Sequence, residues 1–219
     1  MAEIVNPQVE DYLRRLYDDG DPVRQEMEDL ARERHFPIVG PLVGRLLHVL
    51  TRAIGARRVF ELGSGYGYSA LFFARAVGEG GQVHCTDRSP ENLALAEDFL
   101  TRAGVWNRVT YHREDASAAL RRVGGSWDVI YNDIDKEGYP ETVDLAYERL
   151  RPGGLFITDN VLWSARVLPG GDDGSAATGG VVEFTERLFA HPGFLTTIEP
   201  TRDGVAVALK RQEQDLRAS

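Results

Sequence analysis

The sequence predicts an α/β fold in which helices cover both faces of a parallel sheet. Three observations support this prediction: apolar residues recur at helical spacing in the first 54 residues, short apolar segments then alternate with helices, and a glycine-rich turn follows the first of those segments. Repeated β-α units of this length pair in parallel. Ligands of such sheets bind beyond the carboxyl ends of the strands, so the residues that follow each strand are the first candidates for a site.

The expected elements follow in chain order. We expect helices over residues 9–18, 22–34, 42–54, 69–77, 90–103, 116–122, 139–150 and 181–190. We expect strands over residues 58–62, 82–87, 109–113, 127–132, 155–158, 195–199 and 205–210. Asp21 before Pro22 is typical of an N-cap followed by a first-turn proline. The segment 36–41 must interrupt the helices, because proline and glycine are poor in helix interiors.

Length and charge limit the class of protein. A chain of 219 residues leaves little room for two full domains, so we expect one domain over residues 1–219, with a helical extension at 1–54 and an α/β core at 55–211. The net charge of −9 argues against a general binder of nucleic acid or membrane surfaces, because phosphate groups select basic faces.

Cysteine content and targeting signals predict a cytoplasmic protein. Cys85 is the one cysteine and cannot form an intramolecular disulfide, which suits a reducing compartment. Residues 1–21 lack a basic segment followed by an apolar core, so we expect no signal peptide. No run approaches the roughly 20 apolar residues that span a bilayer.

A glycine-rich turn, ELGSGYG at residues 61–67, ends the first expected strand. Its alternating glycines differ from the Gly-x-Gly-x-x-Gly spacing of many dinucleotide sites. Each glycine removes a Cβ where the backbone turns tightly against a ligand, and the next helix offers free N–H groups. The alternative is a tight β-α turn without a ligand.

Carboxylates follow the second and third expected strands. Asp87 lies some 20 positions beyond the glycine turn, where an acidic residue accepts hydrogen bonds from the ribose hydroxyls of an adenosine cofactor. Ser89 before Pro90 is the better helix cap, which leaves Asp87 for a ligand. Asp115 is placed to receive the exocyclic amine of an adenine, and a helix cap is the alternative.

The fourth and fifth expected strands also end in polar residues. Asp133 follows the fourth strand, and Asp159 and Asn160 follow the fifth. If the two strands are parallel neighbours, these side chains converge, and two carboxylates with an amide oxygen are hard ligands suited to Mg²⁺. Lys136 lies beside them as a candidate general base. The alternative is a set of solvated loop residues.

Three segments resemble bacterial class I O-methyltransferases related to the catechol and caffeoyl-CoA O-methyltransferases: VFELGSGYGYSA at 59–70, NDIDKEGYP at 132–140 and LRPGGLFITDNVLWSARV at 150–167. The resemblance covers about residues 21–211. It implies the Rossmann-like fold of S-adenosylmethionine-dependent methyltransferases, with a mostly parallel seven-stranded sheet. It also implies a homodimer.

The resemblance assigns roles to matching residues. Asp133, Asp159 and Asn160 match the metal ligands, generally for Mg²⁺, and Lys136, next to Asp133, matches the catalytic base. The positions that match the S-adenosylmethionine site are Val39, Glu61, Gly63, Ser64, Gly65, Tyr68, Ser69, Asp87, Arg88, Asp115, Ala116 and Asp133. The implied reaction is methylation of a small aromatic acceptor with two vicinal hydroxyls, which the metal chelates while Lys136 takes the proton.

Some residues depart from the family pattern. Asn132 stands where the family commonly has isoleucine or leucine, and Ala165 replaces a common glycine. The segment LPGGDDGSAATGG at 168–180 is flexible in composition, and because this region borders the substrate in the family, we expect a mobile lid. Trp163 is expected either to stack on the substrate or to pack in the interior.

Two other classes of protein are alternatives. A nucleotide-dependent oxidoreductase on a similar sheet explains the glycine turn and Asp87, but it gives no role to the carboxylates and the amide near Lys136. A non-catalytic S-adenosylmethionine-binding module has no need to keep these groups together.

Overall fold

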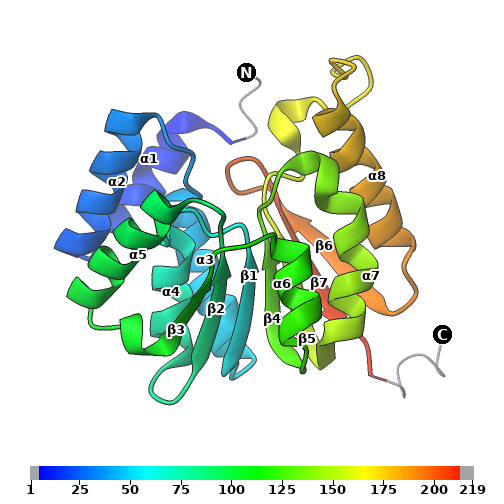
Figure 1. The fold of residues 1–219 in the computed structure, drawn as a ribbon. Helices are drawn as coiled ribbons and strands as arrows, with labels where there is room; N and C mark the ends of the chain where they lie inside the picture. Colours follow the sequence, from blue (N-terminus) through cyan, green and yellow to red (C-terminus); the bar gives the residue numbers. More distant parts are fainter. Residues whose placement is uncertain (1–4, 213–219) are drawn as a thin grey trace.

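The computed structural model describes residues 5–212, in which a seven-stranded sheet lies between two layers of helices (Figure 1). The strands are β1 Arg58–Leu62, β2 Gln82–Thr86, β3 Val109–His112, β4 Trp127–Asn132, β5 Leu150–Thr158, β6 Phe194–Glu199 and β7 Val205–Lys210. Their order is β3-β2-β1-β4-β5-β7-β6, and β7 runs antiparallel to both of its neighbours. The prediction of a Rossmann-like, mostly parallel seven-stranded sheet is confirmed.

Helices cover the two faces of the sheet unequally. They are α1 Pro7–Leu16, α2 Pro22–Arg34, α3 Gly40–Ala53, α4 Tyr68–Val77, α5 Pro90–Arg102, α6 Ala116–Val123, α7 Tyr139–Arg149 and α8 Ala176–Ala190. Short 3-10 helices lie at Trp106–Arg108, Lys136–Gly138 and Trp163–Ala165. The first five α-helices lie on one side and the last three on the other (Figure 1). Within residues 5–212, no helix is both long and apolar enough to cross a lipid bilayer.

Most expected boundaries agree with the structure to within two residues, and two differ by more. The strand expected from 155 begins at Leu150, because Leu150 pairs with Trp127 ahead of a register shift. The helix expected from 181 begins at Ala176, because the Ser175 side chain caps it by accepting from the Thr178 N–H. Gly180 therefore lies inside a helix, where a Cβ would collide with the carbonyl oxygen of Lys136. Close packing explains this helical glycine, which intrinsic propensity disfavours.

Two predicted helix caps are present. The Asp21 carboxylate accepts from the Val23 N–H at 3.1 Å, and the Ser89 hydroxyl accepts from the Asn92 N–H at 3.2 Å. Each cap satisfies an N–H that the first turn of a helix leaves without an intrahelical partner.

The core consists of one apolar cluster on each face of the sheet. On one face Met27 of α2 and Leu47 of α3 are fully buried together with Phe73 of α4. On the other face Phe60 and Trp127 pack with their ring centroids 5.0 Å apart. The N-terminal helices therefore contribute to the same core as the sheet.

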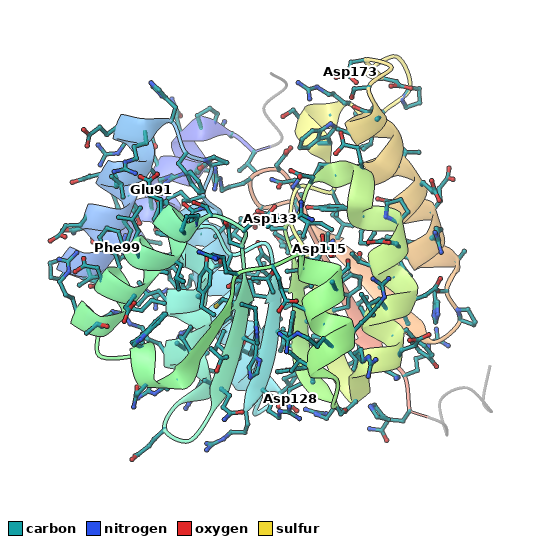
Figure 2. All side chains as sticks on the ribbon, viewed as in Figure 1. Glu91, Phe99, Asp115, Asp128, Asp133 and Asp173 are labelled. Carbon is teal, nitrogen blue, oxygen red and sulfur yellow. The ribbon has the colours of Figure 1, made fainter. Side chains whose placement is uncertain are left out.

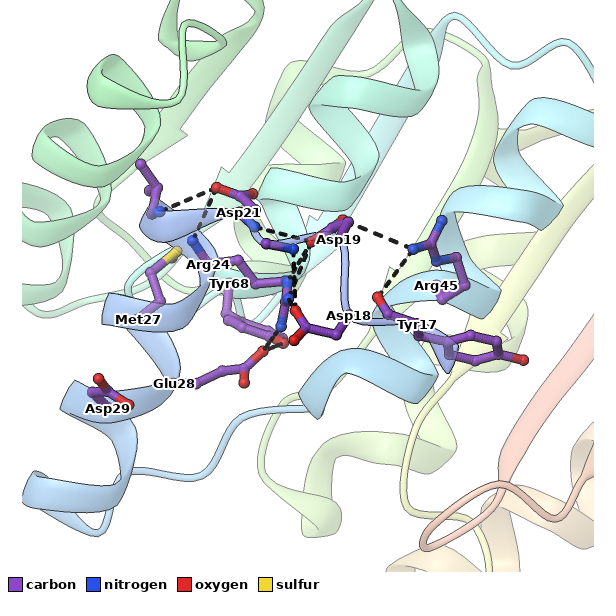
Figure 3. A network of polar contacts seen from close by, with 12 residues as sticks. Tyr17, Asp18, Asp19, Asp21, Arg24, Met27, Glu28, Asp29, Arg45 and Tyr68 are labelled. Carbon is purple, nitrogen blue, oxygen red and sulfur yellow. Dashed lines mark hydrogen bonds and ion pairs between the residues drawn. The ribbon is translucent and has the colours of Figure 1, made fainter. Parts of the chain in front are cut away.

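A buried polar network fixes α2 against α4 (Figure 3). Arg24 is only 4% exposed, and its guanidinium contacts Glu28 at 2.6 Å, Asp18 at 3.0 Å and Asp19 at 3.1 Å. The Tyr68 hydroxyl donates to Glu28 at 2.7 Å. Three carboxylates thus compensate the buried charge of Arg24.

Gly44 and Gly179 make a matched test of helix packing. A Cβ at Gly44 in α3 would lie 2.6 Å from Cζ of Phe72, whereas a Cβ at Gly179 in α8 would meet nothing within 4 Å. We expect Gly44→Ala to lower the free energy of unfolding by about 1–3 kcal/mol through overpacking. We expect Gly179→Ala to raise it by up to about 1 kcal/mol, since alanine favours the helix. Urea unfolding of both variants measures this, and equal effects would contradict the packing described.

Candidate active site

A cavity of about 1620 Å³ opens at the carboxyl ends of the strands. The strand order reverses between β1 and β4, whose last residues, Leu62 and Asn132, are register partners. The Asp133 N–H donates to the Leu62 carbonyl at 2.9 Å, so Asp133 stands at this switch point. Figure 2 shows Asp133 at the upper end of the sheet, with Asp128 at the opposite end.

Two carboxylates meet in the floor of the cavity. Asp159 follows β5 and is only 4% exposed, and its N–H donates to the Asn132 carbonyl at 3.2 Å. Burial raises the pKa of Asp133, and burial together with the negative charge of Asp133 raises the pKa of Asp159. Oδ1 of Asp159 is buried and has no hydrogen-bond partner among the described residues. Asn160, with φ of 58°, follows directly and also lines the cavity.

These donors fit a divalent cation. Asp133 has an ion pair with Lys136 at 2.9 Å, whereas the buried Oδ1 of Asp159 has no partner among the described residues, and such an oxygen costs free energy. Carboxylate and amide oxygens are the ligands of hard cations such as Mg²⁺. Asp133, Asp159 and Asn160 all line this cavity, and they carry oxygen donors of the kind that such an ion takes.

Lys136 is held beside the carboxylates by three acceptors. Its Nζ donates to Oδ1 of Asp133 at 2.9 Å, to the hydroxyl of Tyr139 at 2.8 Å and to the carbonyl of Ile134 at 3.2 Å. The Tyr139 hydroxyl in turn donates to the Asp159 carbonyl at 3.0 Å. The sequence analysis did not identify Tyr139 as a partner of Lys136. Its position three residues after Lys136 could have indicated that the two residues lie in the same turn.

The glycine turn packs against the Asp133 backbone and also borders the cavity. Gly63 has φ of +81°, and a Cβ there would lie 2.5 Å from the carbonyl oxygen of Asp133. The Ser64 N–H donates to the Thr86 carbonyl at 2.8 Å. Gly63, Ser64 and Gly65 all line the cavity. The same glycine turn therefore both packs tightly against the backbone of Asp133 and lines the cavity.

Glu61 lies beneath the cavity and does not line it. Its carboxylate accepts from the Ser69 hydroxyl, which does line the cavity, and from Sγ of Cys85 at 3.5 Å. Burial raises the pKa of Glu61 to about 7. Glu61 is therefore connected to the cavity by its hydrogen bond with Ser69.

Asp87 and Asp115 differ in how far their carboxylates are already engaged. Asp87 accepts from the Ser89 N–H at 2.7 Å and from the Asn92 side chain at 3.1 Å. Asp115 caps α6 by accepting from the Ala118 N–H at 2.9 Å, and its second oxygen pairs with Arg88 at 2.7 Å. The predicted cap at Asp115 is therefore present.

The cavity gathers the other predicted residues and some that were not predicted. Predicted residues that line it are Val39, Gly63, Ser64, Gly65, Tyr68, Ser69, Asp87, Arg88, Asp115, Ala116, Asp133, Lys136, Asp159 and Asn160. Arg202 and Asp203 line it from the turn between β6 and β7. No local motif marked Arg202, because only the antiparallel return of β7 beside β5 brings this turn to the cavity.

The glycine-rich segment 168–180, expected to form a mobile lid, does not line the cavity in this structure. None of the described residues that line the cavity falls within it. Asp173 lies far from Asp133 in Figure 2, and its carboxylate accepts from the hydroxyls of Ser175 and Thr178 at 2.7 Å. Trp163 instead borders the cavity, with its Nε1 donating to the Thr178 hydroxyl at 3.1 Å.

Solved structures that are similar to this one include O-methyltransferases. A crystal structure of an O-methyltransferase from Bacillus cereus in complex with SAH aligns with a TM-score of 0.83 at 26% identity, covering 93% of this chain and 97% of that one. The tomaymycin-synthesis O-methyltransferase from Streptomyces achromogenes, in complex with SAM, aligns with a TM-score of 0.83 at 28% identity, covering 94% and 96%. The fold is therefore that of a Rossmann-like methyltransferase.

Sequence comparison identifies the family. The O-methyltransferase family model matches residues 25–211. The catechol O-methyltransferase of Mycobacterium tuberculosis is 33% identical over 174 residues, which cover 77% of this chain and 78% of that protein. The chain belongs to the O-methyltransferase family. Membership of this family of enzymes decides against both alternative classes of protein, the nucleotide-dependent oxidoreductase and the non-catalytic module.

The buried carboxyl of Glu61 predicts a dependence of stability on pH. Because its pKa is raised from 4.5 to about 7, the folded state binds more protons than the unfolded state between these values. The wild type should therefore lose stability relative to Glu61→Gln as pH rises from 4.5 to 7, by up to about 3 kcal/mol. Urea unfolding across this range measures the difference, with the exposed Glu97→Gln as control. A difference independent of pH would contradict a buried, ionising Glu61.

Proposed function

We propose that this S-adenosylmethionine-dependent O-methyltransferase requires a divalent cation and methylates a small catechol-like acceptor, an aromatic ring with two vicinal hydroxyls. The observation that carries the proposal is the buried Oδ1 of Asp159, which has no hydrogen-bond partner within residues 5–212 and lies in the same cavity as Asp133 and Asn160. The names of two relatives point the same way: the catechol O-methyltransferases of Mycobacterium tuberculosis and Niastella koreensis are 33% and 30% identical to this chain.

Asp133, Asp159 and Asn160 would hold the cation, for which Mg²⁺ is the best fit to oxygen donors. When bound, a cation of this kind supplies a Lewis acid that lowers the pKa of an acceptor hydroxyl. Asp133 has a second role, because it also accepts the hydrogen bond that holds Lys136 in place.

In its neutral amine form, after it has released one of its own protons, Lys136 is the proposed acceptor of the hydroxyl proton. Its Nζ lies at the cavity, 2.9 Å from Asp133 and 2.8 Å from the Tyr139 hydroxyl, and 5.7 Å from the centroid of the Trp163 ring. Asp133 and Tyr139 restrict where Nζ can lie, and a fixed base beside a fixed acceptor removes entropy from the barrier. Trp163 offers a ring face on which an aromatic acceptor would stack.

The cofactor would occupy the side of the cavity formed by β1, β2 and the segment before α3. Asp87, held by Ser89 and Asn92, is the proposed partner of the ribose hydroxyls. The turn at Gly63–Gly65, Tyr68 and Ser69 would contact the remainder. The proposed cofactor-binding residues are Val39, Gly63, Ser64, Gly65, Tyr68, Ser69, Asp87, Arg88, Asp115, Ala116 and Asp133. Glu61, which does not line the cavity, would act through Ser69. Bound SAH and SAM in the two aligned structures support the choice of cofactor.

We also propose a homodimer in the cytoplasm, without a nucleic-acid or membrane partner. Val9, Tyr12 and Leu16 of α1 are each about half exposed, and such apolar side chains favour an interface. The net charge of −9 disfavours anionic partners, and the buried thiol of Cys85 suits a reducing compartment.

Removal of Asp159 tests the metal site. We expect Asp159→Ala to lower kcat for catechol-like acceptors about 100-fold or more and to keep the affinity for SAH, because a cation ligand is lost outside the adenosine site. Methyl transfer to a panel of dihydroxybenzoates, with Mg²⁺ and with a chelator, measures the first effect, and calorimetry measures the second. Asp172→Ala, in the exposed segment, is the control. Wild-type turnover that persists in chelator would refute metal dependence.

Substitution of Asp87 tests the cofactor site. We expect Asp87→Asn to raise the dissociation constant for SAH about 10–100-fold, because charge-assisted hydrogen bonds to the ribose are lost. Asparagine keeps an oxygen that can accept from the Ser89 N–H, so the loop should persist. Calorimetry gives the constants, with Asp98→Asn on the exposed face of α5 as control. An unchanged constant would remove Asp87 from the site.

A further inference from the structure

Arg202 extends from the turn between β6 and β7 across the edge of the cavity. This turn stands above the sheet, between the N-terminal helices and α8 (Figure 1). Nη1 of Arg202 donates to the Ile38 carbonyl at 2.7 Å, in the segment between α2 and α3. Arg202 therefore borders the cavity between the residues that follow β5 and the segment that leads into Val39.

The backbone around Arg202 is fixed. Val161 and Leu162 donate their N–H groups to the carbonyls of Gly204 and Asp203 at 3.0 and 2.9 Å. The Asp203 carboxylate accepts from the Ser164 N–H. Arg202 itself has φ of 53°, a conformation that is uncommon for residues other than glycine. These bonds hold the turn against the segment that carries Asn160, so the position of the guanidinium relative to the metal ligands is set by the fold.

Gly40 provides the space for the guanidinium. A Cβ at Gly40 would lie 2.9 Å from Nη1 of Arg202 and 3.4 Å from its Cζ. The side chain of Arg202 therefore lies directly over the backbone of Gly40, at the wall of the cavity.

The charge of Arg202 is not neutralised by an ion pair. Among residues 5–212, no carboxylate oxygen lies within 4 Å of its guanidinium, and its one hydrogen bond in this part of the chain uses Nη1 alone. Other arginines at the cavity differ, since Arg88 pairs with Asp115 at 2.7 Å and Arg14 with Glu10 at 2.5 Å. A half-buried guanidinium has two further nitrogens with which to bind a ligand in a planar fork.

The field of Arg202 reaches the catalytic carboxyls. Its positive charge lowers the pKa of Asp133 and Asp159, against the larger effect of burial. Without Arg202, two carboxylates in the cavity floor would repel an anionic acceptor. With Arg202, an acceptor can place a negative group at the cavity edge while its hydroxyls face Asp133 and Lys136.

We propose that Arg202 selects acceptors that carry an anionic group, a carboxylate in the simplest case, on the ring opposite the vicinal hydroxyls. The inference rests on the proposed function, since it deepens the assignment of the acceptor. Arg202 is a specificity-determining residue, and the acid-bearing catechols are its substrate class. The alternative is that Arg202 has a purely structural role and only holds the β6–β7 turn against Ile38 through its hydrogen bond.

The test compares 3,4-dihydroxybenzoate with 3,4-dihydroxybenzamide, which share the ring and hydroxyls and differ in charge. We expect the wild type to have a KM for the carboxylate about 10-fold or more below that for the amide. Arg202→Gln should raise the carboxylate KM about 10–100-fold, the range of a charge-assisted hydrogen bond, and leave the amide KM within about 2-fold. Arg202→Lys, which keeps the charge without the fork, should retain part of the preference.

If Arg202 has only a structural role, its substitution should change the KM of both acceptors, the carboxylate and the amide. Equal losses for carboxylate and amide in Arg202→Gln, or equal KM values in the wild type, would overturn the proposal. Arg166→Gln is the matched control, because Arg166 lies 5.4 Å from the Trp163 ring centroid, pairs with Asp173 at 3.4 Å and does not line the cavity. If Arg166→Gln lost the preference for the carboxylate to a similar extent, the loss of any positive charge near the site would explain the effect. This result would also overturn the proposal.

Binding separates this proposal from the proposed function. Dissociation constants of both compounds are measured by calorimetry on the protein with SAH and Mg²⁺. If neither compound is methylated, the proposed function fails for these acceptors, yet tighter binding of the carboxylate that Arg202→Gln abolishes still supports the anion site. If both are methylated and bound without regard to charge, the function stands and the anion site is refuted.

Discussion

The placement of two carboxylates, the partly exposed Asp133 and the buried Asp159, at adjacent strand ends is the constraint on which the rest of the site depends. Buried carboxylates destabilise the folded chain unless protons or positive charges compensate them. Lys136 provides one such charge, held by Tyr139, and Arg202 provides a second from the β6–β7 turn. Oδ1 of Asp159 still has no partner within residues 5–212, which is the physical reason for placing a cation there.

Close backbone contacts hold these charges in position. Gly63 packs on the carbonyl of Asp133, and Gly180 packs on that of Lys136, so no side chain can be accommodated at either glycine. The turn between β4 and α7 is therefore held between the glycine turn and α8. On the opposite side, the Arg24 network fixes α2 against α4 at the wall of the same cavity (Figure 3). A site supported by regular elements keeps its geometry better than one built on loops alone.

Most of the fold could be predicted because its signals are local. Helical periodicity, the N-caps at Asp21 and Ser89, and the short apolar runs of β1 to β4 depend on neighbouring residues. One of the two larger boundary errors has a long-range cause and the other a local one. Leu150 joins β5 through its pairing with Trp127, whereas α8 begins at Ala176 because Ser175 caps it, and its Gly180 then packs on the carbonyl of Lys136.

By itself the sequence determined the family and the chemical groups of the site, because a strand and the residue after it are local features. Asp133 and Asp159 could thus be placed at the sheet edge without coordinates. Tertiary structure decided which groups reach the cavity. It put Glu61 beneath the glycine turn, engaged Asp115 in a cap and an ion pair, and brought Arg202 to the cavity wall. Such contacts join residues far apart in the chain, and strand order and side-chain packing, which no local pattern encodes, determine them.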